Sequence, residues 1–263
     1  MNIPAHRRDD FAGRVVLVTG ASGGIGSAIA LAFAARGASV VVHHHLGQAR
    51  AQQVVKRCQD AGGDAVALAA DLTDLQQMSQ MVDHIQSEMG ALDVLVHNAF
   101  APYRFDPDHR RRFWELGWSD VQAQIDGSVK ACFELTQACL PLMRGRSAAN
   151  LVFMASDLVT RPTIAYADYA TAKSALVGMA RQMAADLGPL GLRVNCVAPG
   201  LVQGTRASDH TPESVREQIL RQTPLGRIAT PADVAGAVMM LASPDAAFIT
   251  GQLLHVDGGL VMN

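Results

Sequence analysis

The sequence predicts an α/β fold in which seven parallel strands form one doubly wound sheet flanked by helices. Short apolar runs alternate with amphipathic stretches along the chain, and glycines or capping residues bound several of those stretches. Strands joined through helices in this order require right-handed crossovers, which produce a parallel sheet. No change of composition marks a linker, so we expect a single domain over residues 1–263.

The expected elements follow one another in strict alternation. The apolar runs have the length of buried strands; they cover residues 14–19, 39–43, 65–69, 92–97, 150–155, 193–197 and 253–256. The helical patterns cover residues 25–36, 47–61, 74–89, 118–143, 166–187 and 231–242. Asp74 is a good N-terminal cap for the third of these helices. Ligands of such sheets collect at the carboxyl ends of the strands, where we expect the functional residues to converge.

Composition excludes several classes of function. The formal charge is −2, with 22 basic and 24 acidic residues, so we expect no nucleic-acid partner. The stretch Met1–Asp10 is polar and has no apolar core, which predicts neither a signal peptide nor a membrane span and points to the cytoplasm. The four cysteines lie in periodic apolar segments without Cys-x2-Cys spacing, so we expect buried thiols, no disulfide and no zinc: Cys58, Cys132, Cys139 and Cys196.

A glycine-rich turn follows the first predicted strand and opens the first helix. It runs from Thr19 through Gly20, Ser22, Gly23, Gly24, Ile25 and Gly26. Glycines lacking side chains let a backbone approach a pyrophosphate, and a helix N-terminus offers unpaired N–H groups. This pattern predicts a dinucleotide site.

A tyrosine and a lysine in the run Tyr-Ala-Thr-Ala-Lys carry the predicted chemistry. A helix places Tyr169 and Lys173 one turn apart on the same face, so the ammonium is expected to lower the pKa of the phenol. Tyr169 is therefore a candidate proton donor and acceptor. Tyr166 has Ala170 four residues on instead of a lysine, so we expect it to form a pocket wall.

The order of these motifs resembles the classical short-chain dehydrogenase/reductase family, and the closing half is most similar to its branch of 3-oxoacyl-(acyl-carrier-protein) reductases. The match extends through Asp71-Leu72, Asn98-Ala99, Pro199-Gly200 and residues 250–259. The resemblance implies a Rossmann-type fold in which Ser156 binds the substrate oxygen, Tyr169 transfers the proton, and Lys173 lowers the pKa of Tyr169 and holds the nicotinamide ribose. The alternative role of Ser156 is a strand-end turn residue.

The same resemblance assigns the cofactor contacts. They are Gly20, Ser22, Gly23, Gly24, Ile25, Gly26, His44, His45, Asp71, Leu72, Asn98, Ala99, Tyr169, Lys173, Pro199, Gly200 and Val202. NAD-preferring members carry an acid at the position of His44, whereas NADP-preferring members place polar or basic groups at Ser22 and His45, so NADP(H) is favoured over NAD(H). Asp71 borders the adenine ring or caps the next helix. Consecutive strand residues point to opposite faces, so His43–His45 are not expected to bind one metal ion.

Two positions depart from the family pattern. Phe100 stands where the family usually has a glycine beside the cofactor. The helix position of the family's active-site asparagine, which supports a proton-relay water, is Ser128 when counted back from Phe133 and Ile125 when counted forward from Trp118. We favour Ser128, which requires a small insertion before it; with Ile125 the relay would be broken.

The expected reaction is reduction of a carbonyl to a secondary alcohol, reversibly, with a 3-oxoacyl thioester on acyl carrier protein or coenzyme A as the leading substrate. Polyketides, sugars and steroids are alternatives, as is a non-catalytic NADP(H)-binding protein. Leu190 replaces a basic residue common in carrier-protein reductases, and Arg110–Arg112 either compensate for it or form a solvated loop. Residues 203–224 are expected to form a substrate flap. Apolar residues beyond the need of one sheet face, together with the family, imply a homotetramer, and we expect no membrane partner.

Overall fold

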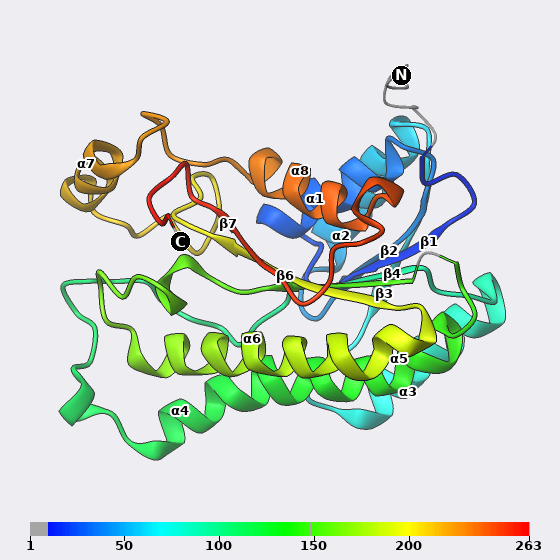
Figure 1. Ribbon diagram of the computed structural model, residues 1–263, viewed down its shortest axis with the longest axis horizontal. Coiled ribbons are helices and arrows are strands. Elements are labelled where there is room, and N and C mark those ends of the chain that lie inside the picture. The colour runs from blue at the N-terminus through cyan, green and yellow to red at the C-terminus, as the bar shows by residue number, and fades with distance from the viewer. Residues whose placement is uncertain (1–9, 148, 263) are drawn as a thin grey trace.

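The computed structural model describes residues 10–147 and 149–262 and contains the predicted seven-stranded parallel sheet (Figure 1). Its strands are β1 (Val15–Val18), β2 (Ser39–His44), β3 (Asp64–Ala69), β4 (Val94–His97), β5 (Asn150–Met154), β6 (Arg193–Pro199) and β7 (Leu253–Val256). The order is β3-β2-β1-β4-β5-β6-β7. The chain leaves β3 for the opposite side of β1, so the strand order reverses between β1 and β4, and this is where a ligand crevice forms.

Helices cover both faces of the sheet, as Figure 1 shows. They are α1 (Gly24–Ala34), α2 (Gln48–Asp60), α3 (Leu75–Met89), α4 (Trp118–Gln124), α5 (Ala131–Met143), α6 (Ala167–Leu187), α7 (Glu213–Gln222) and α8 (Pro231–Ala242). One core joins α1, α2 and α8 to one face of the sheet, and a second joins α3, α5 and α6 to the other.

Strand alternation produces these two cores. Val16 and Val18 of β1 pack in the first core, whereas Leu17 between them packs in the second. Successive side chains of a strand point to opposite faces, so a strand buried on both faces needs the continuous apolar run that the sequence shows. The four cysteines are buried, as predicted from their apolar surroundings.

Two expectations for the helices need correction. The helix predicted over residues 118–143 is interrupted by a π-helical turn, Ile125–Lys130, between α4 and α5. The segment 203–224 contains the helix α7, which the sequence analysis did not predict. Val215 and Ile219, four positions apart on α7, line the pocket, and no residue of α7 is buried.

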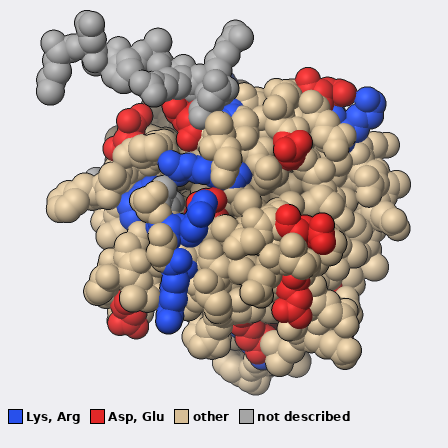
Figure 2. Space-filling view, turned by 90° about the vertical axis from the view of Figure 1, so that its right-hand side faces the viewer, with Lys and Arg blue, Asp and Glu red and all other residues tan. Residues whose placement is uncertain are grey.

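An ion pair between a buried aspartate and a half-buried arginine joins elements at the end of the sheet where the strands begin. Asp93 accepts hydrogen bonds from Val15 N at 2.9 Å and from Arg146 Nε at 2.8 Å, which ties β1, β4 and the segment after α5 together. Figure 2 shows this end of the molecule, where several basic side chains gather on one side and acidic side chains are scattered over the rest. Charges of both signs therefore share this face.

No helix within residues 10–147 and 149–262 is long and apolar enough to span a bilayer. The expectations drawn from Met1–Asp10 concern, apart from Asp10, residues outside those that the structure describes.

Candidate active site

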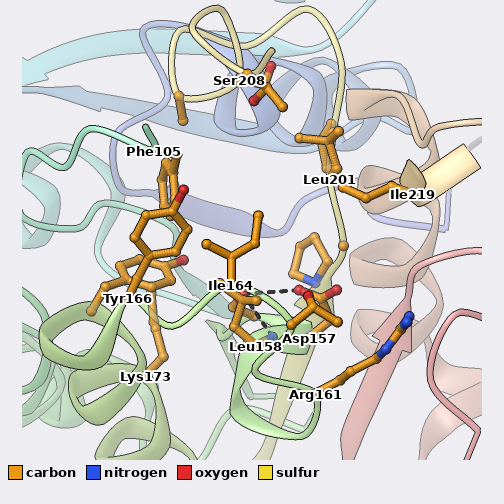
Figure 3. Close-up of a pocket in the computed structure, with 18 of the residues that line it drawn as sticks. Phe105, Asp157, Leu158, Arg161, Ile164, Tyr166, Lys173, Leu201, Ser208 and Ile219 are labelled. Carbon is orange, nitrogen blue, oxygen red and sulfur yellow. Dashed lines mark hydrogen bonds between the residues drawn. The ribbon is translucent and has the colours of Figure 1, made fainter. Parts of the chain in front are cut away.

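A pocket of about 250 Å³ lies at the carboxyl ends of the strands. Its walls bring together residues distant in sequence: Ile25 after β1, Asn98 after β4, Ser156 after β5, Tyr169 from α6 and Gly200 after β6. Figure 3 shows the aromatic side chains of Phe105 and Tyr166 with Lys173 on one side of the pocket, and Asp157 and Arg161 on the other. The predicted convergence of the motifs is therefore present.

The glycine-rich turn is shaped for close backbone approach. Gly20 and Gly24 have φ of +64° and +56°, a region that favours glycine. A Cβ on Gly26 would lie 2.6 Å from Asn98 Nδ2 and 2.6 Å from the carbonyl oxygen of Gly20. The N-terminus of α1 has Gly23 as its cap, with no side-chain cap bond and no acid in its first turn. Its N–H groups are thus free of local anionic partners and fit a pyrophosphate.

Thr19 connects this turn to the end of β4. Its Oγ1 accepts hydrogen bonds from the backbone N–H groups of Asn98 and Ala99, each at 2.9 Å, and the Asn98 side chain donates to the Thr19 carbonyl oxygen at 2.8 Å. The two loops are therefore fixed relative to each other at the edge of the pocket.

The histidines at the end of β2 have three different environments. The ring of His43 is buried between backbone groups: Nδ1 accepts from Gly20 N at 3.0 Å, and Nε2 lies 3.0 Å from the carbonyl oxygen of Ala70. Burial lowers the pKa of His43 to about 4, so this ring is neutral near neutral pH. His44 is buried, whereas His45 is exposed and lies 3.8 Å from an Asp71 carboxylate oxygen.

One basic residue beside the expected dinucleotide site was not predicted from the sequence. A Cβ on Gly47 would lie 2.9 Å from Arg50 Nη2 and 3.0 Å from Ser22 Oγ, so the two groups flank Gly47. Arg50 lies in the first turn of α2. The sequence could have indicated this basic group, because Arg50 lies three residues after the expected start of the helix that follows β2.

Asp71 was expected either to border the adenine ring or to cap the next helix, and the structure decides the question of the cap. Asp74 caps α3, accepting from the backbone N–H groups of Gln76 at 2.9 Å and Gln77 at 3.2 Å, as predicted. Asp71 accepts from the N–H and the hydroxyl of Thr73, and this lowers the pKa of its carboxyl. Asp71 therefore orders the turn before the cap, and Leu72 packs against the second core.

Ser156, Tyr169 and Lys173 are all buried and line the same pocket. Lys173 Nζ donates to the carbonyl oxygen of Met154 at 2.7 Å and lies 5.7 Å from the centre of the Tyr169 ring. α6 supplies the phenol and the ammonium, and the end of β5 supplies the hydroxyl.

The pKa of Tyr169 differs from the sequence-based expectation. Burial raises it above the ordinary value, and the charge of Asp157 raises it further, while the Ser156 hydroxyl opposes the shift. Lys173 was expected to lower the pKa of Tyr169, but it is not among the groups that shift this pKa. Burial also lowers the pKa of Lys173 to about 8, and its ammonium is directed to the Met154 carbonyl. Tyr169 therefore keeps its proton at neutral pH.

The π-helical turn explains the uncertain register before α5. Ser128 lies within it and is buried, and its Oγ has no hydrogen-bond partner among the described residues. Ile125, the other candidate, begins the turn and is only half-buried. A π turn accommodates extra residues in a helix, in agreement with the small insertion inferred before Ser128.

A group of aromatic side chains surrounds the candidate proton donor. The ring centres of Phe105, Tyr103 and Phe100 lie 5.0, 5.1 and 6.1 Å from that of Tyr169. Phe100 also lies 5.1 Å from Lys173 Nζ. Tyr166 is buried in the pocket wall, where it was expected. The sequence analysis noted only Phe100; the aromatic spacing of residues 100, 103 and 105 was the signal for the rest.

The opposite wall comes from the segment after β6 and from α7. Pro199, Gly200, Leu201 and Val202 line the pocket, and Val202 forms an isolated bridge with Ala229. Side chains from 203–224 that line it are Thr205, Ala207, Ser208, Thr211, Val215, Gln218, Ile219 and Gln222. The expected flap segment therefore borders the pocket.

Comparison with known proteins identifies the family. A family model described as enoyl-(acyl carrier protein) reductase matches residues 20–261. The chain belongs to the short-chain dehydrogenase/reductase family. A 3-oxoacyl-(acyl-carrier-protein) reductase, FabG, of Staphylococcus aureus (strain Mu50 / ATCC 700699) is 34% identical over 246 residues, 94% of this chain and 97% of that protein.

Solved structures of this short-chain dehydrogenase/reductase fold are similar over nearly the whole chain. The angucycline C-6 ketoreductase LanV with bound NADP has a TM-score of 0.86 at 29% identity, covering 99% of this chain and 100% of that one. A 7α-hydroxysteroid dehydrogenase complexed with NADH and 7-oxo glycochenodeoxycholic acid has a TM-score of 0.86 at 34% identity, covering 99% of both chains. This chain is therefore an oxidoreductase of a family that binds nicotinamide cofactors.

Proposed function

We propose that this short-chain dehydrogenase/reductase uses NADPH to reduce a carbonyl to a secondary alcohol, with a 3-oxoacyl thioester as the leading substrate. The observation that carries the proposal is the joint position of Ser156, Tyr169 and Lys173 in one pocket, beside a glycine turn that fits a pyrophosphate. The raised pKa of Tyr169 supports the reductive direction, because a reduction requires a phenol that still holds its proton.

Each polar residue has a distinct task in this reaction. When bound, the dinucleotide supplies the hydride that the carbonyl carbon receives. Tyr169 donates its proton to the carbonyl oxygen as negative charge develops there, and Ser156 donates a hydrogen bond to the same oxygen. We propose that Lys173 holds a ribose hydroxyl of the bound cofactor. Ser128, buried with an unpartnered hydroxyl, is proposed to hold a water that returns a proton to the site.

The preference for NADP(H) rests on the end of β2 and the start of α2. His44 stands where an acid would bind a ribose 2′-hydroxyl, and Ser22, His45 and Arg50 supply polar and basic groups nearby. A guanidinium beside a helix N-terminus favours a phosphate. The two structural relatives hold NADP in one case and NADH in the other, so the preference depends on these residues of the chain itself.

The pocket walls favour a substrate with an apolar group beside the reacting carbonyl. Leu158, Ile164, Leu201 and Ile219 line it (Figure 3), and an acyl chain fits such a lining. The relatives act on quite different carbonyl compounds according to their names, so polyketide, sugar and steroid ketones stay alternatives.

Delivery by acyl carrier protein or coenzyme A is proposed with the arginine loop as its test. Arg110 donates to the carbonyl oxygen of Ala165 at 2.9 Å and Arg111 pairs with Asp120, so two of the three arginines have partners within the protein. These contacts favour the solvated-loop interpretation. Replacing Arg110–Arg112 with serine should leave the KM for a small ketone unchanged; a KM for an acyl-carrier substrate that did not rise either would remove the carrier contact.

NADPH consumption measured against a carbonyl panel tests the reaction. The panel contains an acetoacetyl thioester, cyclic ketones, keto sugars and quinones, with NADH and Tyr169→Phe as controls. We expect thioester turnover that falls at least about a hundredfold in Tyr169→Phe, because general-acid catalysis contributes about 10²–10⁴. Turnover of another ketone class alone would change the substrate and keep the mechanism. Equal rates for wild type and Tyr169→Phe would contradict it.

Phe100 favours one alternative function, that of an NADP(H)-binding protein without turnover. Its ring stands against Tyr169 and Lys173 at the position where the family usually has a glycine. Binding of NADPH without turnover of any carbonyl, together with turnover gained by Phe100→Gly, would support that alternative.

We also propose a homotetramer working in the cytoplasm. Buried thiols suit a reducing compartment, and Phe133 and Met240 are large apolar side chains exposed on helices. Light scattering that showed only a monomer at working concentration would contradict the tetramer.

A further inference from the structure

An acidic residue adjoins the serine of the candidate active site. Asp157 follows Ser156, begins a short 3₁₀ turn and is 8% exposed. The Ser156 hydroxyl lies 3.3 Å from Asp157 Oδ1, toward which it donates a hydrogen bond. Figure 3 shows Asp157 at the pocket wall, opposite Tyr166 and Lys173. The hydroxyl that is to bind the substrate oxygen therefore already has a carboxylate partner.

Charged groups from three elements face this carboxylate. Asp257, at the end of β7, is buried beside it and has His255 3.9 Å away. Arg161 follows the 3₁₀ turn and donates to the Leu260 carbonyl oxygen at 3.3 Å and to Gln222 Oε1 at 2.7 Å. Tyr169 of α6 lines the same pocket and is within the range of the Asp157 charge.

Burial and these neighbours bring the pKa of the Asp157 carboxyl close to neutral pH. Burial is the largest cause that raises its pKa, to about 6, and the charge of Asp257 adds to it. The hydrogen bonds from Ser156 and the Leu158 N–H, and the charge of Arg161, oppose the rise. Above about pH 6 the group is therefore mainly a carboxylate.

The carboxylate acts on both residues that contact the reacting oxygen. Its charge disfavours the phenolate form of Tyr169. It also attracts the Ser156 proton in the free pocket. Reduction needs the phenol of Tyr169, whereas oxidation of an alcohol needs the phenolate as proton acceptor. A negative charge at residue 157 therefore raises the pH at which the phenolate needed for oxidation becomes available.

We propose that Asp157 is a positioning residue that holds the Ser156 hydroxyl and places a negative charge in the pocket of Tyr169, and so sets the pH range in which the site works in each direction. The inference rests on the proposed function. In reduction the carbonyl carbon gains hydride from NADPH and the carbonyl oxygen gains the Tyr169 proton; in oxidation the alcohol returns both, to NADP⁺ and to the phenolate. Asp157 does not change the overall equilibrium, only the pH range in which each direction is fast.

The test compares Asp157→Asn with Asp168→Asn. Asn keeps the size and the polar atoms of Asp and removes the charge. Asp168 is next to Tyr169 in sequence, but its carboxylate accepts a hydrogen bond from the Tyr103 hydroxyl at 2.7 Å. The measurement is kcat/KM against pH in both directions, with the N-acetylcysteamine thioesters of acetoacetate and 3-hydroxybutyrate.

We expect the midpoint of the rise in oxidation rate to move to lower pH by about one unit in Asp157→Asn, since a nearby like charge shifts a pKa by about that much or more. Asp168→Asn should leave the midpoint in place. Asp157→Ser, which also removes the charge, gives the same test if Asp157→Asn does not fold.

Coincident midpoints for wild type and Asp157→Asn, with turnover still dependent on Tyr169, would overturn this inference alone. Equal loss of both directions at every pH would do the same, because it would indicate a merely structural role. Turnover of no carbonyl, or turnover unchanged in Tyr169→Phe, would overturn the proposed function, and this inference with it.

Discussion

Adding one methyl group at Gly26 tests whether the glycine turn is built as the structure indicates. In Gly26→Ala the new Cβ would lie 2.6 Å from Asn98 Nδ2 and from the Gly20 carbonyl oxygen, whereas ordinary contacts begin at 3.4 Å. The neighbours must therefore move by about 0.8 Å, an overpacking that costs about 1–3 kcal/mol. Moving the Asn98 amide also weakens its 2.8 Å hydrogen bond to the Thr19 carbonyl, worth about 1 kcal/mol.

The expected loss in the free energy of unfolding is therefore about 2–4 kcal/mol. This corresponds to a Tm lower by about 4–16 °C, because 1 kcal/mol shifts Tm by about 2–4 °C in chains of similar size. Urea unfolding and calorimetry measure the effect. NADPH titration should show at least about tenfold weaker binding, since the start of α1 moves with the turn.

Gly23→Ala is the matched control in the same turn. Gly23 has φ of 178°, an extended conformation open to any residue, and a Cβ there would meet nothing within 4 Å. Alanine is a poorer helix cap than glycine, so we expect a loss below about 1 kcal/mol. Gly26→Ala no less stable than Gly23→Ala would refute the steric reasoning.

Three further changes probe individual groups of the site. Because the pKa of His43 is lower in the folded chain than in the unfolded one, the unfolded chain binds more protons between about pH 6.5 and 4, and stability falls as the pH falls through this window. Urea unfolding at pH 7 and 4.5 should therefore show about 2–3 kcal/mol less acid destabilisation in His43→Gln than in wild type, and no such change in the exposed control His84→Gln. Arg50→Ala should weaken the binding of NADPH about tenfold or more in a fluorescence titration and leave the binding of NADH unchanged, because a charged hydrogen bond contributes about 1.5–3 kcal/mol. Arg57→Ala, in the last turn of the same helix, is the control. Equal losses of affinity for both cofactors in Arg50→Ala would count against the phosphate contact. Ser128→Ala removes a buried unpartnered hydroxyl, so stability should stay equal or rise by about 1 kcal/mol while the rate of reduction falls; an unchanged rate would exclude the proposed water.

Local patterns in the sequence predicted the sheet and most of the helices. The five inner strands are largely buried, so their apolar runs are continuous and visible without any knowledge of their neighbours, whereas the edge strands β3 and β7 are only partly buried. The cap at Asp74 and the turn at Gly20 depend on a few adjacent residues, and for that reason they too were predictable. Since the carboxyl ends of parallel strands lie at one edge of the sheet, the sequence also predicted that Ser156 and Tyr169 would lie there.

Only the tertiary structure decided the register before α5 and the electrostatics of the pocket. The π turn that buries Ser128 depends on packing, including the close approach of Gly127 to Ala101, which no local pattern encodes. Spacing along a helix predicted that Lys173 would lower the pKa of Tyr169, but burial and the charge of Asp157 raise it. A pKa depends on all the charges and solvent around a group in three dimensions, and for Asp157 these include Asp257, which lies 100 positions further along the chain.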